Sequence, residues 1–201
     1  GVEVFFVISG YLITLLLIGE HERTGFVDLG QFWLRRLRRL LPALLTMIGL
    51  LVLWCALFER EQLAAMRGDV LAGLGYVSNW YQIFTPPGHA DEYVFAPLRH
   101  LWGLAVAEQF YVVWFLVMVW LLRSGGRRRL FDVSRWLVLV AVGLTVLTAL
   151  IFVPGRTRSP ATTPGHYWSL FGRDVARESV AYLSTITRSV GLLLGAAFAM
   201  I

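Results

Sequence analysis

Charged residues are scarce in this chain of 201 residues, where they make up 15% of the total. A globular protein usually has about a quarter. Hydrophobic residues reach 57%, and the mean hydropathy is +0.66. This composition excludes a disordered chain and argues against an ordinary water-soluble domain, because too little polar surface is present to face water. We therefore expect most of the surface to face lipid.

Lysine is absent, so all 18 basic residues are arginine, and the net charge is +5. The arginines gather between apolar runs rather than on one soluble face, which favours cytoplasmic loop charge over nucleic-acid binding. The single cysteine, Cys55, lies in an apolar run, so no disulfide framework is predicted. His21, His89 and His166 have no partner at ligand spacing, so we predict no metal site.

Four apolar runs have the ~20 residues that a membrane-spanning helix needs, and a fifth begins near residue 189. The predicted spans are 2–19, 40–58, 101–122, 136–153 and the cut-off run 189–201. A shorter stretch, 70–84, carries several polar and aromatic residues and is predicted to be a re-entrant or interfacial helix. The predicted fold class is all-α: a polytopic transmembrane bundle of about five spans, in which residues 1–201 form one membrane-embedded domain truncated at both ends.

The topology depends on whether 70–84 crosses the membrane. If it does not, the arginine-rich stretches 20–39 and 123–135 lie on the same side, which the positive-inside rule makes cytoplasmic. If it does cross, 154–188 lies inside and 123–135 outside. We favour the first arrangement, because the charge of 123–135 lies close to both helix ends, where the rule is most reliable.

Four arginines, Arg35, Arg36, Arg38 and Arg39, stand directly before the apolar run that begins at residue 40. Helical spacing places Arg35, Arg38 and Arg39 on one face. Guanidinium groups bind phosphate through paired hydrogen bonds, so this face could hold a nucleotide-like cofactor or an anionic lipid head group. The alternative is that the charges only set the topology.

Glu108 lies about a third of the way into an apolar helix, where a carboxylate costs a few kcal/mol unless it is paired, protonated or beside water. We expect it to be functional, the alternative being a structural hydrogen bond to a neighbouring helix. Glu3 poses the same question at the membrane edge. His100 has the pKa range for acid–base chemistry but also suits an interfacial polar group.

Five segments carry a family resemblance: GVEVFFVISGYLIT, FWLRRLRRLLPAL, YVSNWY, HLWGLAVAEQFYVVW and TRSVGLLLGA. In this order and at these separations they closely resemble the acyltransferase-3 family of integral-membrane acyltransferases. The resemblance runs nearly from end to end of the chain.

The resemblance implies a bundle of about ten transmembrane helices that moves an acyl group, often acetyl, from cytoplasmic acyl-CoA to an extracytoplasmic acceptor. The expected acceptor is a hydroxyl of a glycan, a glycolipid or a related compound, and the expected location is the bacterial plasma membrane. Arg35 with Arg38, and Arg36 with Arg39, match the family's R-x-x-R motif and are expected to hold the phosphates of acetyl-CoA. Glu108, Glu3, His100 and Arg188 are the candidate catalytic residues.

The chain departs from the family pattern at several positions. The family's catalytic histidine lies on a helix before the GVDVFF-type motif, so the chain is expected to hold only part of the active site. Ala107 stands where the family's more regular acid lies, and Gly103 replaces serine. Helical geometry places position 107 within about 20° of the face of His100 and Glu108 about 80° away. Ile186 replaces the acid of a T-D-T-R run that keeps Arg188.

These losses leave a second function open. A degenerate family member could keep the fold and act as a membrane scaffold or a transporter-like subunit. The changes at Ala107 and Ile186 favour this alternative, whereas the arginine cluster, Glu3 and Glu108 favour the enzyme.

Overall fold

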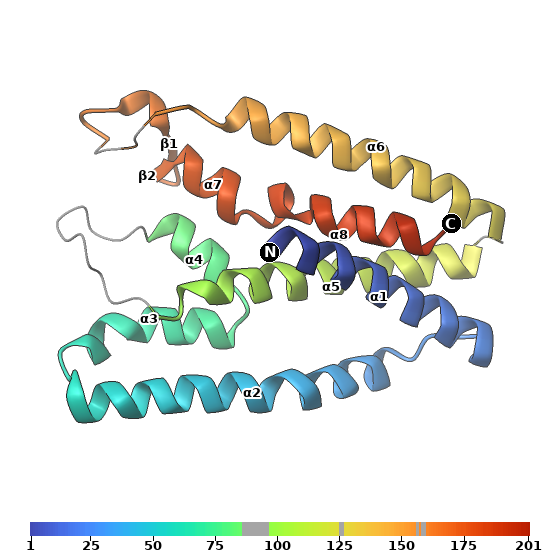
Figure 1. Ribbon diagram of the computed structural model, residues 1–201, viewed down its shortest axis with the longest axis horizontal. Coiled ribbons are helices and arrows are strands. Elements are labelled where there is room, and N and C mark those ends of the chain that lie inside the picture. Colours follow the sequence, from blue (N-terminus) through green and yellow to red (C-terminus); the bar gives the residue numbers. More distant parts are fainter. Residues whose placement is uncertain (86–96, 125–126, 156, 158–159) are drawn as a thin grey trace.

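The computed structural model describes residues 1–85, 97–124, 127–155, 157 and 160–201, and they form a bundle of helices with one small hairpin (Figure 1). The α-helices are α1 Val2–Thr24, α2 Leu29–Phe58, α3 Gln62–Leu74, α4 Ser78–Phe84, α5 Trp102–Ser124, α6 Arg127–Ile151, α7 Arg177–Leu183 and α8 Thr185–Ala199. Two short 3-10 helices, η1 Arg99–Leu101 and η2 Pro164–His166, and two strands, β1 Tyr167–Leu170 and β2 Arg173–Ala176, complete the described elements.

Within the described residues, five helical segments are long and apolar enough to cross a membrane, which confirms the predicted number of spans. They are Val2–Thr24, Leu29–Phe58, Arg99–Ser124, Arg129–Ile151 and Arg177–Ala199, and each contains most of one predicted run. The second span begins earlier than predicted, because the Asp28 side chain caps the helix by accepting a hydrogen bond from the Gln31 amide at 3.0 Å. The arginine cluster is therefore part of the helix, as the prediction of a common helix face for its arginines requires.

The stretch 70–84 was predicted to be one helix. In the structure it contains the end of α3 and the whole of α4. The chain turns between them at Tyr76, whose φ of 53° lies in the left-handed region. Helices α3 and α4 form a helical hairpin that begins and ends at the same end of the bundle (Figure 1). This path agrees with the re-entrant prediction.

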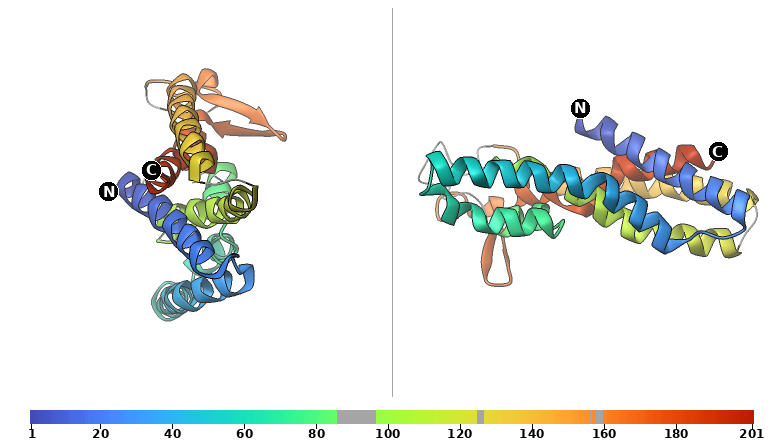
Figure 2. Two further views of the ribbon diagram at one scale, coloured as in Figure 1. Left: turned by 90° about the vertical axis from the view of Figure 1, so that its right-hand side faces the viewer. Right: turned by 90° about the horizontal axis from the view of Figure 1, so that it is seen from below.

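The arginine-rich stretches 20–39 and 123–135 distinguish one end of the bundle from the other. The end of α1, the start of α2, the end of α5 and the start of α6 lie together at one end, which we call the arginine end (Figures 1 and 2). The outer ends of α3 and α4 and the β1–β2 hairpin lie at the other, which we call the hairpin end. The stretches 20–39 and 123–135 thus share an end, as the favoured topology predicts. That this end is cytoplasmic stays a prediction.

Helix α5 lies at the centre, and more of it is buried than of any other span. Its apolar residues pack against α1 and α8 in one core that includes Phe6, Val106, Met118 and Leu192. The antiparallel pair of β1 and β2 is the only departure from the predicted all-α class among the described residues, and it joins through Phe171 and Gly172, both at positive φ.

Candidate functional site

An ion pair inside the bundle joins two of the predicted site residues. The guanidinium of Arg36 on α2 donates to both carboxylate oxygens of Glu108 on α5: Nε lies 3.0 Å from each oxygen and Nη2 lies 2.8 Å from Oε1. Glu108 is only 6% exposed. The Arg36 guanidinium also lies over the Tyr111 ring, 3.7 Å from its centroid. The pair satisfies the condition under which a carboxylate is tolerated inside a membrane helix.

Two adjoining cavities lie beside this pair, between α1, α2 and α5. One, of about 410 Å³, opens among charged residues at the arginine end and is lined by Ile13, Leu16, Glu20, Arg23, Phe32, Arg35, Arg36 and Arg39. The other, of about 290 Å³, is mainly apolar and is lined by Phe5, Ile8, Ser9, Leu12, Ile13, Leu16, Arg36, Arg39, Leu40, Leu104, Ala107, Glu108 and Tyr111. Because they share four residues, Arg36 and Arg39 among them, we treat them as one arginine groove.

The four arginines of the cluster do not all face this groove. Arg35, Arg36 and Arg39 line it together with Phe32, at the i, i+3, i+4 and i+7 positions of one helical stripe. Arg38 is exposed and is not one of the described residues that line either cavity. The face that meets the groove is therefore that of Arg35, Arg36 and Arg39, rather than the predicted face of Arg35, Arg38 and Arg39.

The outer part of the groove is charged on both helices. Arg35 donates to Glu20 on α1 at 2.9 Å, and its side chain is 57% exposed. The inner part is lined by apolar side chains, apart from Ser9, Arg39, Tyr111 and the Arg36–Glu108 pair. Ala107, where the resemblance expects an acid, lines this inner part beside Glu108 and is 1% exposed. Positions 107 and 108 thus both reach the same cavity, despite their angular separation on α5.

The other two candidates of opposite charge, Glu3 and Arg188, also form an ion pair, between the starts of α1 and α8. The Arg188 Nε donates to the Tyr182 carbonyl at 2.6 Å, and its guanidinium lies 4.2 Å from the centre of the Tyr182 ring. This pair joins α1 to α8, whereas the first joins α2 to α5. The two pairs therefore hold different helices.

His100 lies apart from both pairs. It is exposed in η1, before α5, and the structure gives its ring no hydrogen-bond partner among the described residues. It does not line either cavity of the arginine groove. The structure thus brings Glu108 to the arginines and leaves His100 at the hairpin end.

Comparison with known proteins gives this arrangement a family. The sequence pattern of the acyltransferase-3 family, which is described as an "Acyltransferase domain", matches residues 1–201, the whole chain. The chain belongs to the acyltransferase-3 family. Its relatives include the YrhL protein of Bacillus subtilis, 39% identical, an "O-acetyltransferase OatA" of Staphylococcus aureus, 37% identical, and a "Peptidoglycan O-acetyltransferase OatA" of Listeria monocytogenes, 36% identical.

Each alignment covers the whole of this chain but only 28–30% of the relative, so the chain spans less than a third of the proteins it matches. No solved structure matches the chain. The chain thus combines an acyltransferase domain of this family with five helices that are long and apolar enough to cross a membrane.

A polar network that the sequence did not predict connects two of the acyltransferase-3 segments with Thr185, which lies two residues before a third. Gln109, next to Glu108, donates to the Tyr76 carbonyl at 2.7 Å and to Asn79 Oδ1 at 2.9 Å. Its own oxygen accepts from the Trp80 indole at 2.9 Å and from the Thr185 hydroxyl at 2.6 Å. The sequence signal that could have revealed this network is a glutamine inside an apolar helix, because polar side chains between membrane helices hydrogen-bond to one another. The network fixes α4 against α5 and α8.

Tyr76 lies at the break between α3 and α4, and its buried hydroxyl has no hydrogen-bond partner in the structure. Burial raises the pKa of this hydroxyl, the negative charge of Glu108 raises it further, and Arg36 opposes the shift. The ring therefore lies within electrostatic reach of the Arg36–Glu108 pair. Strained backbone and an unpaired buried polar atom are both more common at functional sites than elsewhere.

Among the described residues, no three His, Cys, Asp or Glu side chains gather as a metal site would require. His89 lies outside the described residues. That the protein uses no metal stays a prediction.

Proposed function

We propose that this chain is part of a membrane O-acetyltransferase that takes the acetyl group of acetyl-CoA at its arginine end. The acceptor is a hydroxyl of a peptidoglycan-type glycan at the hairpin end, outside the bacterial plasma membrane. The name of the Listeria relative supports acetyl transfer to peptidoglycan, and that of the Staphylococcus relative supports O-acetyl transfer. The single observation that carries the donor assignment is the arginine groove, in which three arginines border a cavity that continues inward to Glu108.

The groove has the two parts that acyl-CoA requires. Its outer part presents the guanidiniums of Arg35 and Arg39, which suit the phosphates of the nucleotide. Its inner part is smaller and is lined mostly by apolar side chains, which suits the uncharged arm that ends in the thioester. The nucleotide can thus stay at the membrane surface while only the arm enters the bundle.

The reaction is an acyl transfer. The acceptor oxygen attacks the thioester carbonyl, a carbon–oxygen ester bond forms, the carbon–sulfur bond breaks, and the hydroxyl proton ends on the thiol of coenzyme A. Glu108 engages Nε and Nη2 of Arg36, which leaves Nη1 to face the negative oxygen that develops on the carbonyl. Glu108 is therefore a positioning residue, and the base is the histidine that the resemblance implies elsewhere in the protein.

Glu3, Arg188 and His100 take supporting places in this proposal. The Glu3–Arg188 pair holds the starts of α1 and α8 together and so fixes one wall of the groove. His100 lies in η1, directly before α5, whose start is at the hairpin end (Figure 1), and there it can meet an acceptor but not the donor phosphates.

Single substitutions in the cluster test the donor site in the full-length protein. We expect Arg39→Ala to weaken acetyl-CoA binding by about tenfold, because one charge-assisted phosphate contact is worth about 1.5–3 kcal/mol. Arg38→Ala is the matched control, since it removes the same charge from the same turn but faces away from the groove. Binding is measured by equilibrium titration with labelled acetyl-CoA in nanodiscs. Equal losses in both variants would contradict a specific groove and favour a purely topological role.

The second candidate function, a degenerate member acting as a scaffold, is favoured by one observation. Ala107 lines the inner groove where the resemblance expects an acid. Release of free coenzyme A by the wild-type full-length protein in the presence of acceptor would exclude this candidate. Donor binding without any release would favour it.

A further inference from the structure

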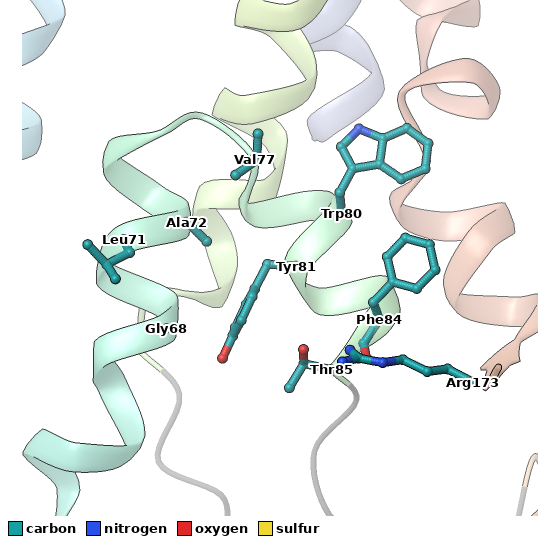
Figure 3. A pocket seen from close by; sticks show the side chains of 9 residues that line it. All are labelled: Gly68, Leu71, Ala72, Val77, Trp80, Tyr81, Phe84, Thr85 and Arg173. Carbon is teal, nitrogen blue, oxygen red and sulfur yellow. The ribbon is translucent and has the colours of Figure 1, made fainter. Parts of the chain in front are cut away.

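A further pocket, larger than either single cavity of the arginine groove, lies at the hairpin end. It has a volume of about 610 Å³ and lies between α3, α4 and the β1–β2 hairpin (Figure 3). Its described lining consists of Gly68, Leu71, Ala72, Val77, Trp80, Tyr81, Phe84, Thr85 and Arg173. It shares no described residue with the arginine groove. The two cavities therefore belong to opposite ends of the bundle.

Three aromatic rings from two turns of α4 line this pocket, and two of them are held in place. The Trp80 indole is fixed by its hydrogen bond to Gln109. Tyr81 lies directly over Gly68 of α3, so closely that a Cβ there would lie 2.0 Å from the tyrosine hydroxyl. Glycine at position 68 makes room for the ring. Phe84 completes the aromatic lining and contacts Phe171 at the hairpin tip, with ring centres 6.3 Å apart.

The pocket has one charged group in its described lining. The exposed side chain of Arg173 extends from β2 toward Thr85 (Figure 3). One of its nitrogens, Nη1, donates to the Phe84 carbonyl at a long 3.4 Å. Its other guanidinium donors have no partner among the described residues, and no carboxylate belongs to the described lining of the pocket. The Thr85 hydroxyl and the Tyr81 hydroxyl add two neutral polar groups.

We propose that this pocket binds the acceptor glycan as a sugar chain that carries a carboxylate; this rests on the proposed function. The apolar C–H face of a pyranose ring packs on an aromatic face, and hydroxyl groups around the ring suit Thr85 and Tyr81. Arg173 pairs with a carboxylate of the peptide stem that peptidoglycan sugars bear. A lipid chain would use the apolar walls but not the open cation.

The place of the pocket supports this occupant. Helix α4 supplies the three rings, and its residues Asn79 and Trp80 are hydrogen-bonded to Gln109, which directly follows Glu108 on α5. A glycan bound against α4 therefore rests on the element that adjoins the inner end of the donor groove. Helix α4 also lies toward the hairpin end of the bundle, opposite the arginine end (Figure 1).

Binding of two soluble probes to the full-length protein, without any donor, tests the proposal. One probe is a muropeptide tetrasaccharide with free peptide carboxylates, and the other is the neutral N-acetylglucosamine tetrasaccharide. We expect Tyr81→Ala to weaken the binding of both by about tenfold or more, as loss of a stacking ring does for other ring-shaped ligands. Arg173→Ala should weaken only the muropeptide, to the affinity of the neutral probe.

Three further variants make the result specific. Gly68→Ala keeps every ring but displaces Tyr81, and it should weaken both probes severalfold. Arg60→Ala removes another exposed arginine that donates to a backbone carbonyl, and Trp136→Ala removes an exposed ring from α6. Both should bind like wild type. Equal binding by wild type and Tyr81→Ala would overturn the proposal, and so would quenching of Trp80 fluorescence by brominated lipid, which would show that acyl chains fill the pocket.

The donor assay separates this inference from the proposed function. Muropeptide binding that depends on Tyr81 and Arg173, in a protein that does not use acetyl-CoA, would support the pocket and refute the donor assignment. Acetyl transfer that is normal in Tyr81→Ala and Arg173→Ala would refute the pocket and leave the transferase intact.

Discussion

Helix α1 has two contrasting neighbours. Against α8 it packs backbone to backbone: a Cβ on Gly195 would lie 1.9 Å from the Val7 carbonyl oxygen, and one on Gly10 would lie 2.0 Å from that of Leu192. Against α2 it stands apart, and the space between them is the arginine groove. On the α8 side of α1, small residues bring the two backbones into contact and leave no space, whereas the α2 side keeps the groove.

The two sides are also held by different forces. Glycines separated by three residues, Gly191 and Gly195, allow the close contact with α8, where dispersion between backbones is the main attraction. Helix α2 is held at the groove by the Arg36–Glu108 pair and by aromatic contacts such as that of Phe32 with Phe115, whose ring centres lie 5.1 Å apart. The first contact depends mainly on shape, with the Glu3–Arg188 pair at one end, and the second depends largely on charge.

The largest effect on stability is expected from adding a methyl group where α1 and α8 are in backbone contact. Gly195→Ala places a methyl group on a backbone oxygen that cannot move aside, and we expect a loss of about 3 kcal/mol or more of unfolding free energy. Gly143→Ala is the matched control on α6, where no atom lies within 4 Å, and should change stability by no more than about 1 kcal/mol. Thermal unfolding in detergent measures both. Similar melting temperatures for the two variants would show that the helices are not in backbone contact.

An intermediate effect is expected from the charged contact of α2. Arg36→Ala leaves Glu108 buried without a partner and should cost about 3 kcal/mol, as loss of one member of a buried pair does. Arg35→Ala, one residue away, breaks only an exposed pair with Glu20 and should cost less than about 1 kcal/mol. Unfolding by denaturing detergent compares them. If the double variant Arg36→Met with Glu108→Leu does not recover stability, the cost lies in packing on Tyr111 rather than in charge.

The smallest effect is expected at Tyr76. Because its pKa is raised in the folded protein, the folded state keeps a proton that the unfolded state loses, and stability should fall as the pH rises above the ordinary tyrosine value of about 10. Tyr76→Phe removes this contribution and should lose less stability over the same alkaline range. Melting temperatures at a series of pH values measure the difference. Parallel curves for the two proteins would show that burial in the fold does not raise the pKa of this hydroxyl.

The break between α3 and α4 shows why part of the fold was not predictable. Apolar periodicity around 70–84 is continuous enough to suggest one short helix, but Gln109, which lies 33 residues later than Tyr76, binds the Tyr76 carbonyl at the turn. The β1–β2 hairpin was missed for a similar reason, since its strands are only four residues long. Short elements depend on contacts that the local pattern does not contain.

The acyltransferase-3 segments identified the arginines, but not their individual directions. Each step along a helix turns by 100°, so Arg36 and Arg38 differ in direction although both match the same R-x-x-R motif. Which of them faces inward depends on where α5 lies. The partner of Glu108 therefore could not be chosen from the sequence.

The sequence by itself determined the five membrane spans and the shared end of the two arginine-rich stretches, because length and hydropathy decide which segments enter a bilayer. Only the tertiary structure decided which charges meet. Arg36 pairs with Glu108 across 72 residues of sequence, and Arg188 pairs with Glu3 across 185. A charge in an apolar surrounding is stabilised only when packing brings its partner close.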